Sequence, residues 1–360
     1  MAPPRQEEKL KLDELIARIR PLDEGAMQAA ANRQELLTKP RGSLGRLEEL
    51  SIRVAGMTGD PLPRLQHKAV IVMAGDHGVV EEGVSAYPQD VTAQMVLNFL
   101  HGGAAINVFA RQAGARVIVV DTGVAADLPA DANLIVRKIG HGTANLAKGP
   151  AMTRAQARES IISGAEIAEA EIARGVDMLA TGDMGIGNTT PSAAIAVVLS
   201  GRPIEEIAGR GTGVDEAGLE RKISAIRRGL EVNRPDASDG LDVLGKVGGF
   251  EIGGLAGAIL AAAANRKPVI IDGSISTAAA MIAVCLAPEA RNYLIAAHVS
   301  EERGHRIMLD WLHLQPLLDL NMRLGEGTGA VLAMNVVEAA CRALTEMATF
   351  DEAGVSEKSE

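Results

Sequence analysis

The chain has 360 residues, a length typical of two domains or of one large domain with appendages, and enough to bury a core without disulfides or a structural metal. Its 36 Lys and Arg residues against 46 Asp and Glu residues leave a net charge of −10, which argues against a general nucleic-acid binder or a polybasic membrane binder. Aromatic residues make up only 2% of the chain, so stacking platforms for single-stranded nucleic acid are not expected.

The two cysteines, Cys285 and Cys341, lie in apolar stretches, and we predict two free thiols rather than a disulfide. No spacing typical of a Cys- or His-based zinc site occurs. The first residues lack the apolar segment of a signal peptide, and the apolar run 278–287 is too short to cross a membrane. We therefore expect a cytoplasmic protein without a membrane span.

The first part of the chain, residues 1–65, is polar and shows helical periodicity in KLDELIARI and RLEELSIRVAGM. A loop with two glycines and a proline, residues 39–45, separates these two segments. Pro61 and Pro63 then mark a boundary, after which the pattern changes.

Short apolar runs rich in Val and Ile follow, and helical stretches separate them. The predicted strands are 69–75, 116–123, 176–183, 268–274 and 293–300, with 133–139 as a weaker candidate. Continuous apolar runs are typical of parallel strands buried on both faces, and their alternation with helices predicts a doubly wound α/β sheet. Residues 328–349 are predicted to form one apolar helix, and we expect the polar tail behind it to be disordered.

The predicted strands end in small or polar residues, among them Asp76, Asp183, Asp272 and His298. In open α/β sheets the ligand crevice lies outside the carboxyl ends of the strands, so we expect these tips to converge on one site. The alternative is that they are ordinary strand-to-helix turns. Strand-end histidines such as His298 are interpreted as structural hydrogen-bonding groups, because no HExxH spacing supports a zinc site.

The richest segment, residues 181–190, combines a strand end, a glycine-rich turn and a helix start. Glycines let backbone N–H groups approach an anion, and a helix N-terminus adds a positive partial charge. The alternative is a capped helix after a tight turn, and the pattern names no cofactor because it is neither a dinucleotide fingerprint nor a P-loop. The GxxxxGK match at 240–246 is rejected, because Val247 stands where a P-loop has Ser or Thr.

Two further charged residues follow or interrupt glycine-rich turns. Lys222 lies on an amphipathic helix after residues 209–213, where it is either solvated or neutralises a phosphate. Glu326 lies among glycines before the last helix, where it either complements the helix dipole or acts as a general base with a pKa raised by burial. From the residues alone we infer an α/β enzyme that handles a small, anionic, phosphorylated substrate.

Several longer motifs run through the chain in order: GDHGVVEEGVSAYPQDVTAQM, GDMGIGNTTPSAA, GRGTGVDEAGLERK, AHVSEERGH and MRLGEGTGA. Together, from about residue 39 to residue 334, they resemble the nicotinate-nucleotide–dimethylbenzimidazole phosphoribosyltransferase family. The resemblance implies a large α/β domain at 66–327, a small helical domain from 1–65 and 328–350, and a disordered tail at 351–360. It also implies a homodimer in which the small domain of one subunit lies near the site of the other.

The implied reaction transfers the phosphoribosyl group of nicotinate mononucleotide to a nitrogen of dimethylbenzimidazole, giving α-ribazole phosphate and nicotinate, with no metal and no other cofactor. The family's catalytic glutamate falls on Glu326. A second family carboxylate falls on Asp183, where the family typically has Glu. Because Asp is one methylene shorter, direct contact with substrate and a positioning role both stay open.

The resemblance also assigns binding residues. Those for phosphate and ribose are Gly185, Gly187, Asn188, Thr189, Lys222, Ser300 and Arg323. Those for the base are Tyr87, Met95 and Leu324. In better-known members the positions of Tyr87 and Met95 are smaller or more polar, so the accepted base stays open among benzimidazoles, purines and phenols.

Two other classes of function are alternatives to this transferase. An NAD-dependent oxidoreductase is disfavoured by the absence of a GxGxxG turn, and titration with NAD(H) would detect one. A non-catalytic carrier or sensor of a benzimidazole or ribotide is disfavoured by the two candidate carboxylates, and turnover would distinguish it.

Overall fold

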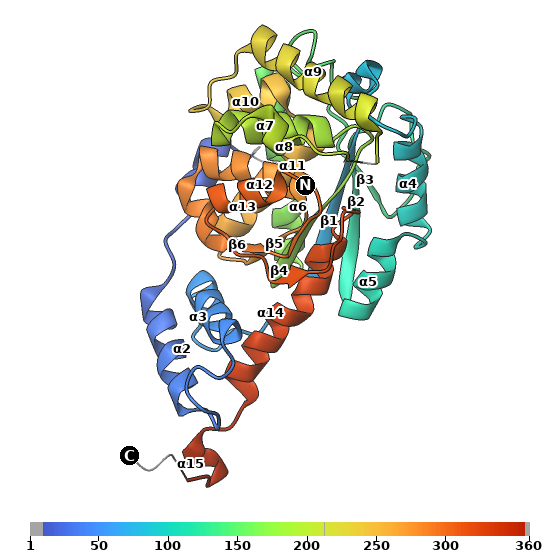
Figure 1. Ribbon diagram of the computed structural model, residues 1–360. Coiled ribbons are helices and arrows are strands. Elements are labelled where there is room, and N and C mark those ends of the chain that lie inside the picture. The colour runs from blue at the N-terminus through green and yellow to red at the C-terminus, as the bar shows by residue number, and fades with distance from the viewer. Residues whose placement is uncertain (1–9, 212, 357–360) are drawn as a thin grey trace.

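The computed structural model describes residues 10–211 and 213–356 (Figure 1), so the ends of the predicted segments 1–65 and 351–360 lie outside the described residues. A sheet with strand order β3-β2-β1-β4-β5-β6 runs through the molecule, and every neighbouring pair is parallel. The strands are β1 (Lys68–Gly75), β2 (Ala115–Gly123), β3 (Leu134–Val136), β4 (Met178–Met184), β5 (Val269–Ile271) and β6 (Leu294–Ala296). The predicted doubly wound α/β sheet is confirmed, including the weaker candidate at 133–139.

Helices cover both faces of this sheet. On one face, α11 (Phe250–Ala264) packs on β1, β2 and β4, and a Cβ at its Gly254 would lie 2.2 Å from the Met73 sulfur. On the other face lie α5 (Ala105–Ala113) and α14 (Thr328–Glu346), and Gly327, before α14, lies against Val70. Val70 and Met73 point to opposite faces because side chains alternate along a strand.

Further helices of the α/β body connect the strands or cover these layers. They are α4 (Val91–Leu100), α6 (Arg154–Ala173), α7 (Thr189–Ser200), α8 (Ile204–Ile207), α9 (Glu216–Asn233), α10 (Gly240–Val247), α12 (Ser274–Leu286) and α13 (His305–Trp311), with single 3-10 turns at Gly78–Glu82 and Pro288–Tyr293. None of the helices in the described part of the chain combines the length and apolar character that crossing a membrane requires.

Glycines bring α6 and α11 into backbone contact. A Cβ at Gly257 would lie only 1.8 Å from the carbonyl oxygen of Ile161, and a Cβ at Gly164 would lie 1.8 Å from that of Gly254. Neither position can therefore carry a side chain without separating the two helices. The small residues of α11, which begins at Phe250, thus allow it to pack closely on α6.

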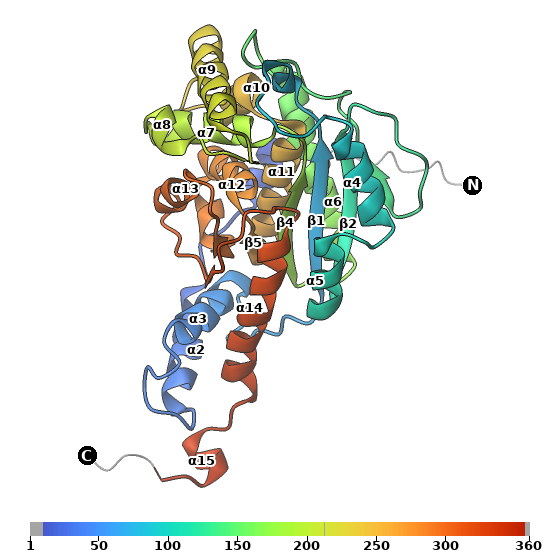
Figure 2. The same cartoon turned by 45° about the vertical axis from the view of Figure 1, so that its right-hand side comes forward.

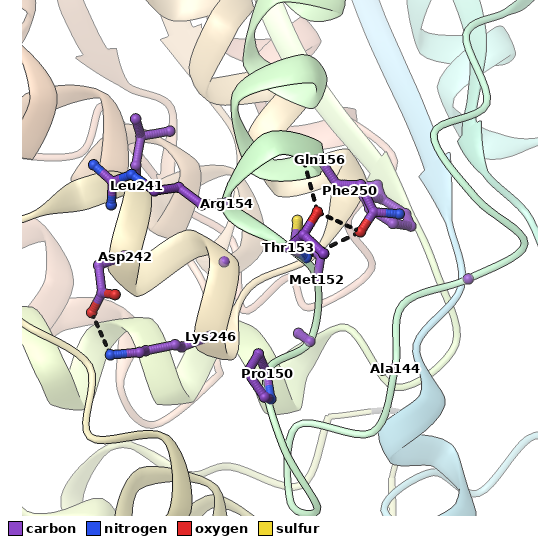
Figure 3. Close-up of a pocket in the computed structure, with 13 residues that line it drawn as sticks. Ala144, Pro150, Met152, Thr153, Arg154, Gln156, Leu241, Asp242, Lys246 and Phe250 are labelled. Carbon is purple, nitrogen blue, oxygen red and sulfur yellow. Dashed lines mark hydrogen bonds and ion pairs between the residues drawn. The ribbon is translucent and has the colours of Figure 1, made fainter.

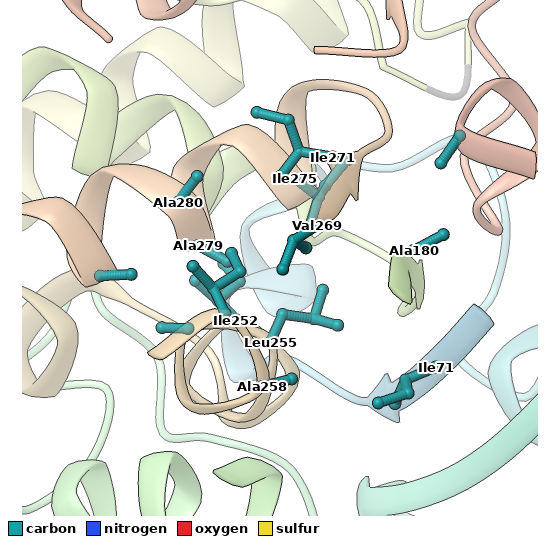
Figure 4. Close-up of a cluster of buried hydrophobic side chains, with 14 of the residues drawn as sticks. Ile71, Ala180, Ile252, Leu255, Ala258, Val269, Ile271, Ile275, Ala279 and Ala280 are labelled. Carbon is teal, nitrogen blue, oxygen red and sulfur yellow. The ribbon is translucent and has the colours of Figure 1, made fainter. Parts of the chain in front are cut away.

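The core is aliphatic, as the low aromatic content predicts. Figure 4 shows part of it, where Ile71 and Ala180 of the sheet face Ile252 and Leu255 of α11, and α12 closes the cluster. All of these side chains are buried. Cys285 and Cys341 are free, which confirms the prediction of two thiols without a disulfide.

The predicted strand 293–300 is divided in two. Its first half is β6, whereas β7 (His298–Val299) leaves the main sheet and pairs in parallel with β8 (Leu318–Asp319). The division arises because the carbonyl of Ala297 accepts hydrogen bonds from the backbone of Leu317 and Leu318. The chain thereby turns away from β5 and carries His298 towards the start of α14.

A helical arm projects from the α/β body in Figures 1 and 2, formed by α2 (Glu24–Leu36), α3 (Arg46–Thr58) and the second half of α14. Ala30, Ala55 and Leu344 form a small core between these three helices. Helix α1 (Leu12–Ala17) differs from the expectation for 1–65, because it packs on α6 and α11 instead. Part of the expected disordered tail is ordered as α15 (Phe350–Ala353), which Thr349 caps.

Candidate active site

The site lies where the winding of the sheet reverses. From β1 the chain continues to β2 on one side, whereas β4 is followed by β5 on the other, so β1 and β4 flank the topological switch point at which such folds bind ligands. The tip of β4 carries Asp183, and the tip of β5 is followed by Asp272. The turn before α14 carries Glu326 to the same edge of the sheet.

Glu326 occupies a turn in the left-handed region of backbone space. The φ angles of Gly325, Glu326 and Gly327 are +86°, +63° and +91°. The turn presses on β4, since a Cβ at Gly182 would lie 2.4 Å from the carbonyl oxygen of Glu326. Glycines on both sides of Glu326, and at position 182, are thus what allows this residue to approach the strand.

The Glu326 carboxylate is buried at the start of α5. Its Oε2 accepts a hydrogen bond of 3.2 Å from the backbone N–H of Ile106, in the first turn of a helix whose own N-cap, Ala104, has no polar side chain. Burial raises the pKa of Glu326, the Ile106 N–H lowers it and nearby Asp272 raises it, with a net upward shift. A raised pKa makes this carboxylate a stronger proton acceptor than an exposed glutamate.

Asp183 lies beside this turn, because a Cβ at Gly325 would lie 3.5 Å from its Oδ2. Its Oδ2 accepts a hydrogen bond of 2.9 Å from Asn188, while its buried Oδ1 has no partner among the described residues. Burial, followed by the charges of Asp272 and other carboxylates, raises the pKa of Asp183 well above its usual value. The structure thus brings the two predicted carboxylates together and favours the protonated form of Asp183.

Asp272 is a site-forming residue to which the sequence assigned no role of its own. Its Oδ1 accepts from the N–H of Ala330 at 2.8 Å, and its Oδ2 accepts from Gly327 at 3.2 Å. It therefore anchors both the Glu326 turn and the first turn of α14, with His298 Nε2 at 3.8 Å. Its place at a strand tip indicated a role, but the two backbone N–H groups that it anchors lie more than fifty residues away in sequence.

The predicted phosphate residues gather at the start of α7. Gly185, Gly187, Asn188 and Thr189 form the turn between β4 and α7, and Gly187 has a φ of +87°. Lys222 from α9 reaches this turn, with its Nζ donating to the Thr189 hydroxyl at 2.9 Å and to the Gly209 carbonyl at 3.0 Å. Lys222 is buried, so the solvated alternative is wrong, and burial lowers its pKa to about 8.

Ser300 and Arg323 lie at the rim of this group. The Ser300 N–H donates to His305 Nδ1 at 2.8 Å, and His305 Nε2 lies 2.9 Å from the Thr277 hydroxyl. Burial lowers the pKa of His305 to about 3, so its ring is neutral and fixes the Ser300 backbone. Arg323 is exposed and donates to the carbonyl of Gly211 at 3.4 Å.

The predicted base-binding residues are less closely gathered. The side chains of Tyr87 and Leu324 are more than half exposed, at 53% and 57%. Met95 lies on α4 and packs in part against the main core. Within the described residues no hydrogen bond or ring contact joins these three side chains, so their common role stays a prediction.

A cavity of about 520 Å³ lies apart from these residues, between the start of α6 and α10 (Figure 3). Its charged side chains are already paired, Lys246 with Asp242 at 2.9 Å and Arg154 with Asp239 at 2.7 Å. None of the predicted site residues lines it. In the part of the chain that the structure describes, no group of three or more His, Cys, Asp and Glu side chains is arranged to hold a metal ion.

Comparisons with known proteins agree with this arrangement. A family model described as "Phosphoribosyltransferase" matches residues 19–355. The nicotinate-nucleotide–dimethylbenzimidazole phosphoribosyltransferase of Roseiflexus sp. (strain RS-1) is 63% identical over 349 residues, which cover 97% of this chain and 99% of the relative. The enzyme of the same name from Desulforudis audaxviator is 61% identical, with 95% and 97% covered.

Solved structures give the same result. A crystal structure of CobT from Thermus thermophilus superposes with a TM-score of 0.90 at 51% identity, covering 93% of this chain and all of the other. The chain belongs to the nicotinate-nucleotide–dimethylbenzimidazole phosphoribosyltransferase family.

Proposed function

We propose that this protein transfers the phosphoribosyl group of nicotinate mononucleotide to dimethylbenzimidazole, giving α-ribazole phosphate for the lower ligand of cobalamin. The observation that carries the proposal is the buried Glu326 turn, set beside Asp183 and close to the Lys222–Thr189 group. A base and an anion site at one sheet edge are what the transfer of a phosphorylated sugar to a weakly acidic heterocycle requires.

Glu326 is the general base in this proposal. One benzimidazole nitrogen attacks the anomeric carbon, the bond from that carbon to the nicotinate nitrogen breaks, and its electron pair leaves with nicotinate. The other benzimidazole nitrogen gives its proton to Glu326, which passes it to solvent. The upward shift of the Glu326 pKa supports this role, because a higher pKa makes the carboxylate a stronger base.

Asp183 positions the phosphate turn in this proposal and does not stabilise the transition state through its charge. Its raised pKa favours the neutral form, which offers little stabilisation to positive charge at the anomeric carbon. Its hydrogen bond with Asn188 ties the β4 tip to the phosphate turn. The shorter side chain at this position is compatible with that role.

The phosphate is bound by the turn Gly185–Thr189 and by Lys222, whose Nζ has a third proton beyond those donated to Thr189 and Gly209. Ser300 and Arg323 complete this binding group. Tyr87, Met95 and Leu324 bind the base, and an apolar pocket of this kind discriminates single methyl groups by only about 1–3 kcal/mol. We therefore propose that several benzimidazoles are accepted.

The proposed assembly is a homodimer in which the helical arm of one subunit lies near the site of the other, with a large α/β domain at 66–327 in each. The cytoplasm is the proposed compartment, and two free cysteines fit its reducing conditions. The arm supports the assembly, because it projects from the body and so presents surface to which a partner subunit can bind.

The direct test mixes the purified protein with nicotinate mononucleotide and dimethylbenzimidazole and follows both products by chromatography and mass spectrometry. Formation of α-ribazole phosphate with equimolar nicotinate supports the proposal. Binding of both substrates by calorimetry without product would favour a carrier or sensor instead. Failure to bind either substrate would refute the proposal.

A further inference from the structure

A buried ion pair lies beneath the proposed phosphate turn and has no part in the mechanism above. His77, just after β1, places its Nε2 2.9 Å from Oε1 of Glu251, in the first turn of α11. The two side chains are 1% and 0% exposed. Water therefore reaches neither partner, and the pair belongs wholly to the interior.

The pair supports Gly185 from below. A Cβ at Gly185 would lie 2.2 Å from the Gly75 carbonyl oxygen and 3.2 Å from His77 Nε2. A Cβ at Gly249 would lie 2.5 Å from both His77 Cε1 and Glu251 Oε2. A Cβ at Gly75 would lie 3.1 Å from Glu251 Oε2, so three glycines bring the backbone of β1, of the residue before α11 and of the phosphate turn close to this ion pair.

The groups facing the imidazole are acidic. Burial opposes protonation of His77, but Glu251 and then Asp76 outweigh it, and the pKa of His77 is raised. Glu251 in turn contributes to the raised pKa of Asp183 on β4. Among the described residues, neither ring nitrogen of His77 and neither carboxylate oxygen of Glu251 has a hydrogen-bond partner, so the 2.9 Å contact joins the two side chains as an ion pair.

Stability explains this pair poorly. A buried ion pair seldom stabilises a fold more than apolar side chains of the same volume would, because desolvation offsets the attraction. Its position under a turn that must hold a phosphate offers a better explanation. At metal sites, residues that orient a ligand without touching the metal change affinity or activity by about 10–100-fold when removed, and the same reasoning applies to a phosphate turn.

Building on the proposed function, we propose that His77 and Glu251 are positioning residues whose ion pair holds the turn Gly185–Thr189 at the distance at which it binds the nucleotide phosphate. The imidazole sets the distance between Gly185 and the end of β1. Glu251 fixes the imidazole to α11. Neither residue touches the substrate.

The test compares His77→Gln, Glu251→Gln and the double variant with Glu338→Gln. Glu338, on α14, pairs with Lys68 at the opposite end of β1, so its variant makes the same chemical change in a largely buried ion pair of that strand far from the site. We expect the His77 and Glu251 variants to raise KM for nicotinate mononucleotide about tenfold, as for other supporting residues. KM for dimethylbenzimidazole should stay at the wild-type value, a split that general loosening would not produce.

Calorimetry with inorganic phosphate gives a second readout that does not depend on turnover. We expect Kd for phosphate to rise in parallel in the double variant, which replaces both charges and so leaves no unpaired one. If wild-type protein binds phosphate but makes no product, the proposed reaction fails while the role of the pair is still judged. A folded double variant that binds phosphate like the wild type, or weakening of equal size in Glu338→Gln, would overturn the proposal.

Discussion

Glu326 combines two unfavourable conditions, a buried carboxylate and a left-handed backbone. A residue with a Cβ pays about 1–2 kcal/mol for that conformation. Its surroundings offset the cost, because Asp272 holds the following residues and the Ile106 N–H holds the carboxylate. Strain kept in place by several independent hydrogen bonds is common where a side chain must be aimed.

Glu326→Gln should lower kcat by about 100-fold or more, in line with the loss of a general base, and leave the affinity for nicotinate mononucleotide unchanged. The amide keeps the size of the side chain and can still accept from Ile106. Steady-state kinetics and calorimetry separate the two effects. Wild-type kcat in a folded variant would remove Glu326 as the base.

Lys222 should make the binding of nicotinate mononucleotide depend on pH. Its pKa is lowered from 10.5 to about 8 by burial, so it loses its charge as the pH rises above that value. We expect KM for nicotinate mononucleotide to rise above about pH 8 in the wild type. In Lys222→Met this limb of the pH profile should be absent, and its persistence would assign it to another group.

The lowered pKa of Lys222 weakens substrate binding as the pH rises, but it has the opposite effect on the stability of the fold. Between pH 8 and 10.5 the unfolded chain holds a proton on Lys222 that the folded chain has lost. The contribution of Lys222 to the free energy of unfolding therefore rises with pH through this window. Urea unfolding of the wild type and of Lys222→Met at several pH values measures it, and a flat difference between them would contradict the burial effect.

At the scale of elements, the contact between α6 and α11 is the most sensitive to added volume. In Gly257→Ala the new methyl group would collide with the Ile161 carbonyl, so the helices must separate. Overpacking of this kind costs about 1–3 kcal/mol, which exceeds the gain in helix propensity. Gly149→Ala is the matched control, because nothing lies within 4 Å of its added Cβ, and equal urea midpoints for the two variants would contradict this reasoning.

The parallel strands were predictable because a strand buried on both faces is marked by its own residues, as in 69–75 and 116–123. The division of 293–300 was not, because it depends on Leu317 and Leu318, which only the folded chain brings to Ala297. The anchoring role of Asp272 was hidden for the same reason. The burial of Lys222 could not be predicted from the sequence either, because the pattern of its helix was compatible with both a solvated and a buried side chain.

At the scale of the whole molecule, the proposed dimer would explain why the helical arm projects from the α/β body. In the arm, Glu48 holds the loop 39–45 through Lys39 Nζ at 2.8 Å and the Leu44 N–H at 3.0 Å. If this loop serves the partner's site, Glu48→Ala should lose activity while the α/β body stays folded. Light scattering should give the mass of two chains.

Subunit exchange distinguishes this from simple loss of stability. Mixing Glu48→Ala with Glu326→Gln should restore activity that neither variant has alone, because one site in each mixed dimer combines an intact arm with an intact base. Circular dichroism of each variant is the control for folding. Dimers that exchange subunits and remain inactive would show that each site is complete within one chain.

Helix α14 has a consequence for how the two ends of the molecule communicate. Its 19 residues rise about 28 Å, from the turn that holds Glu326 to the arm, and no glycine follows Gly329 to bend it. A stiff rod of this kind behaves as a lever. A tilt imposed on the arm is therefore delivered to Glu326 directly, without a relay of side chains between them.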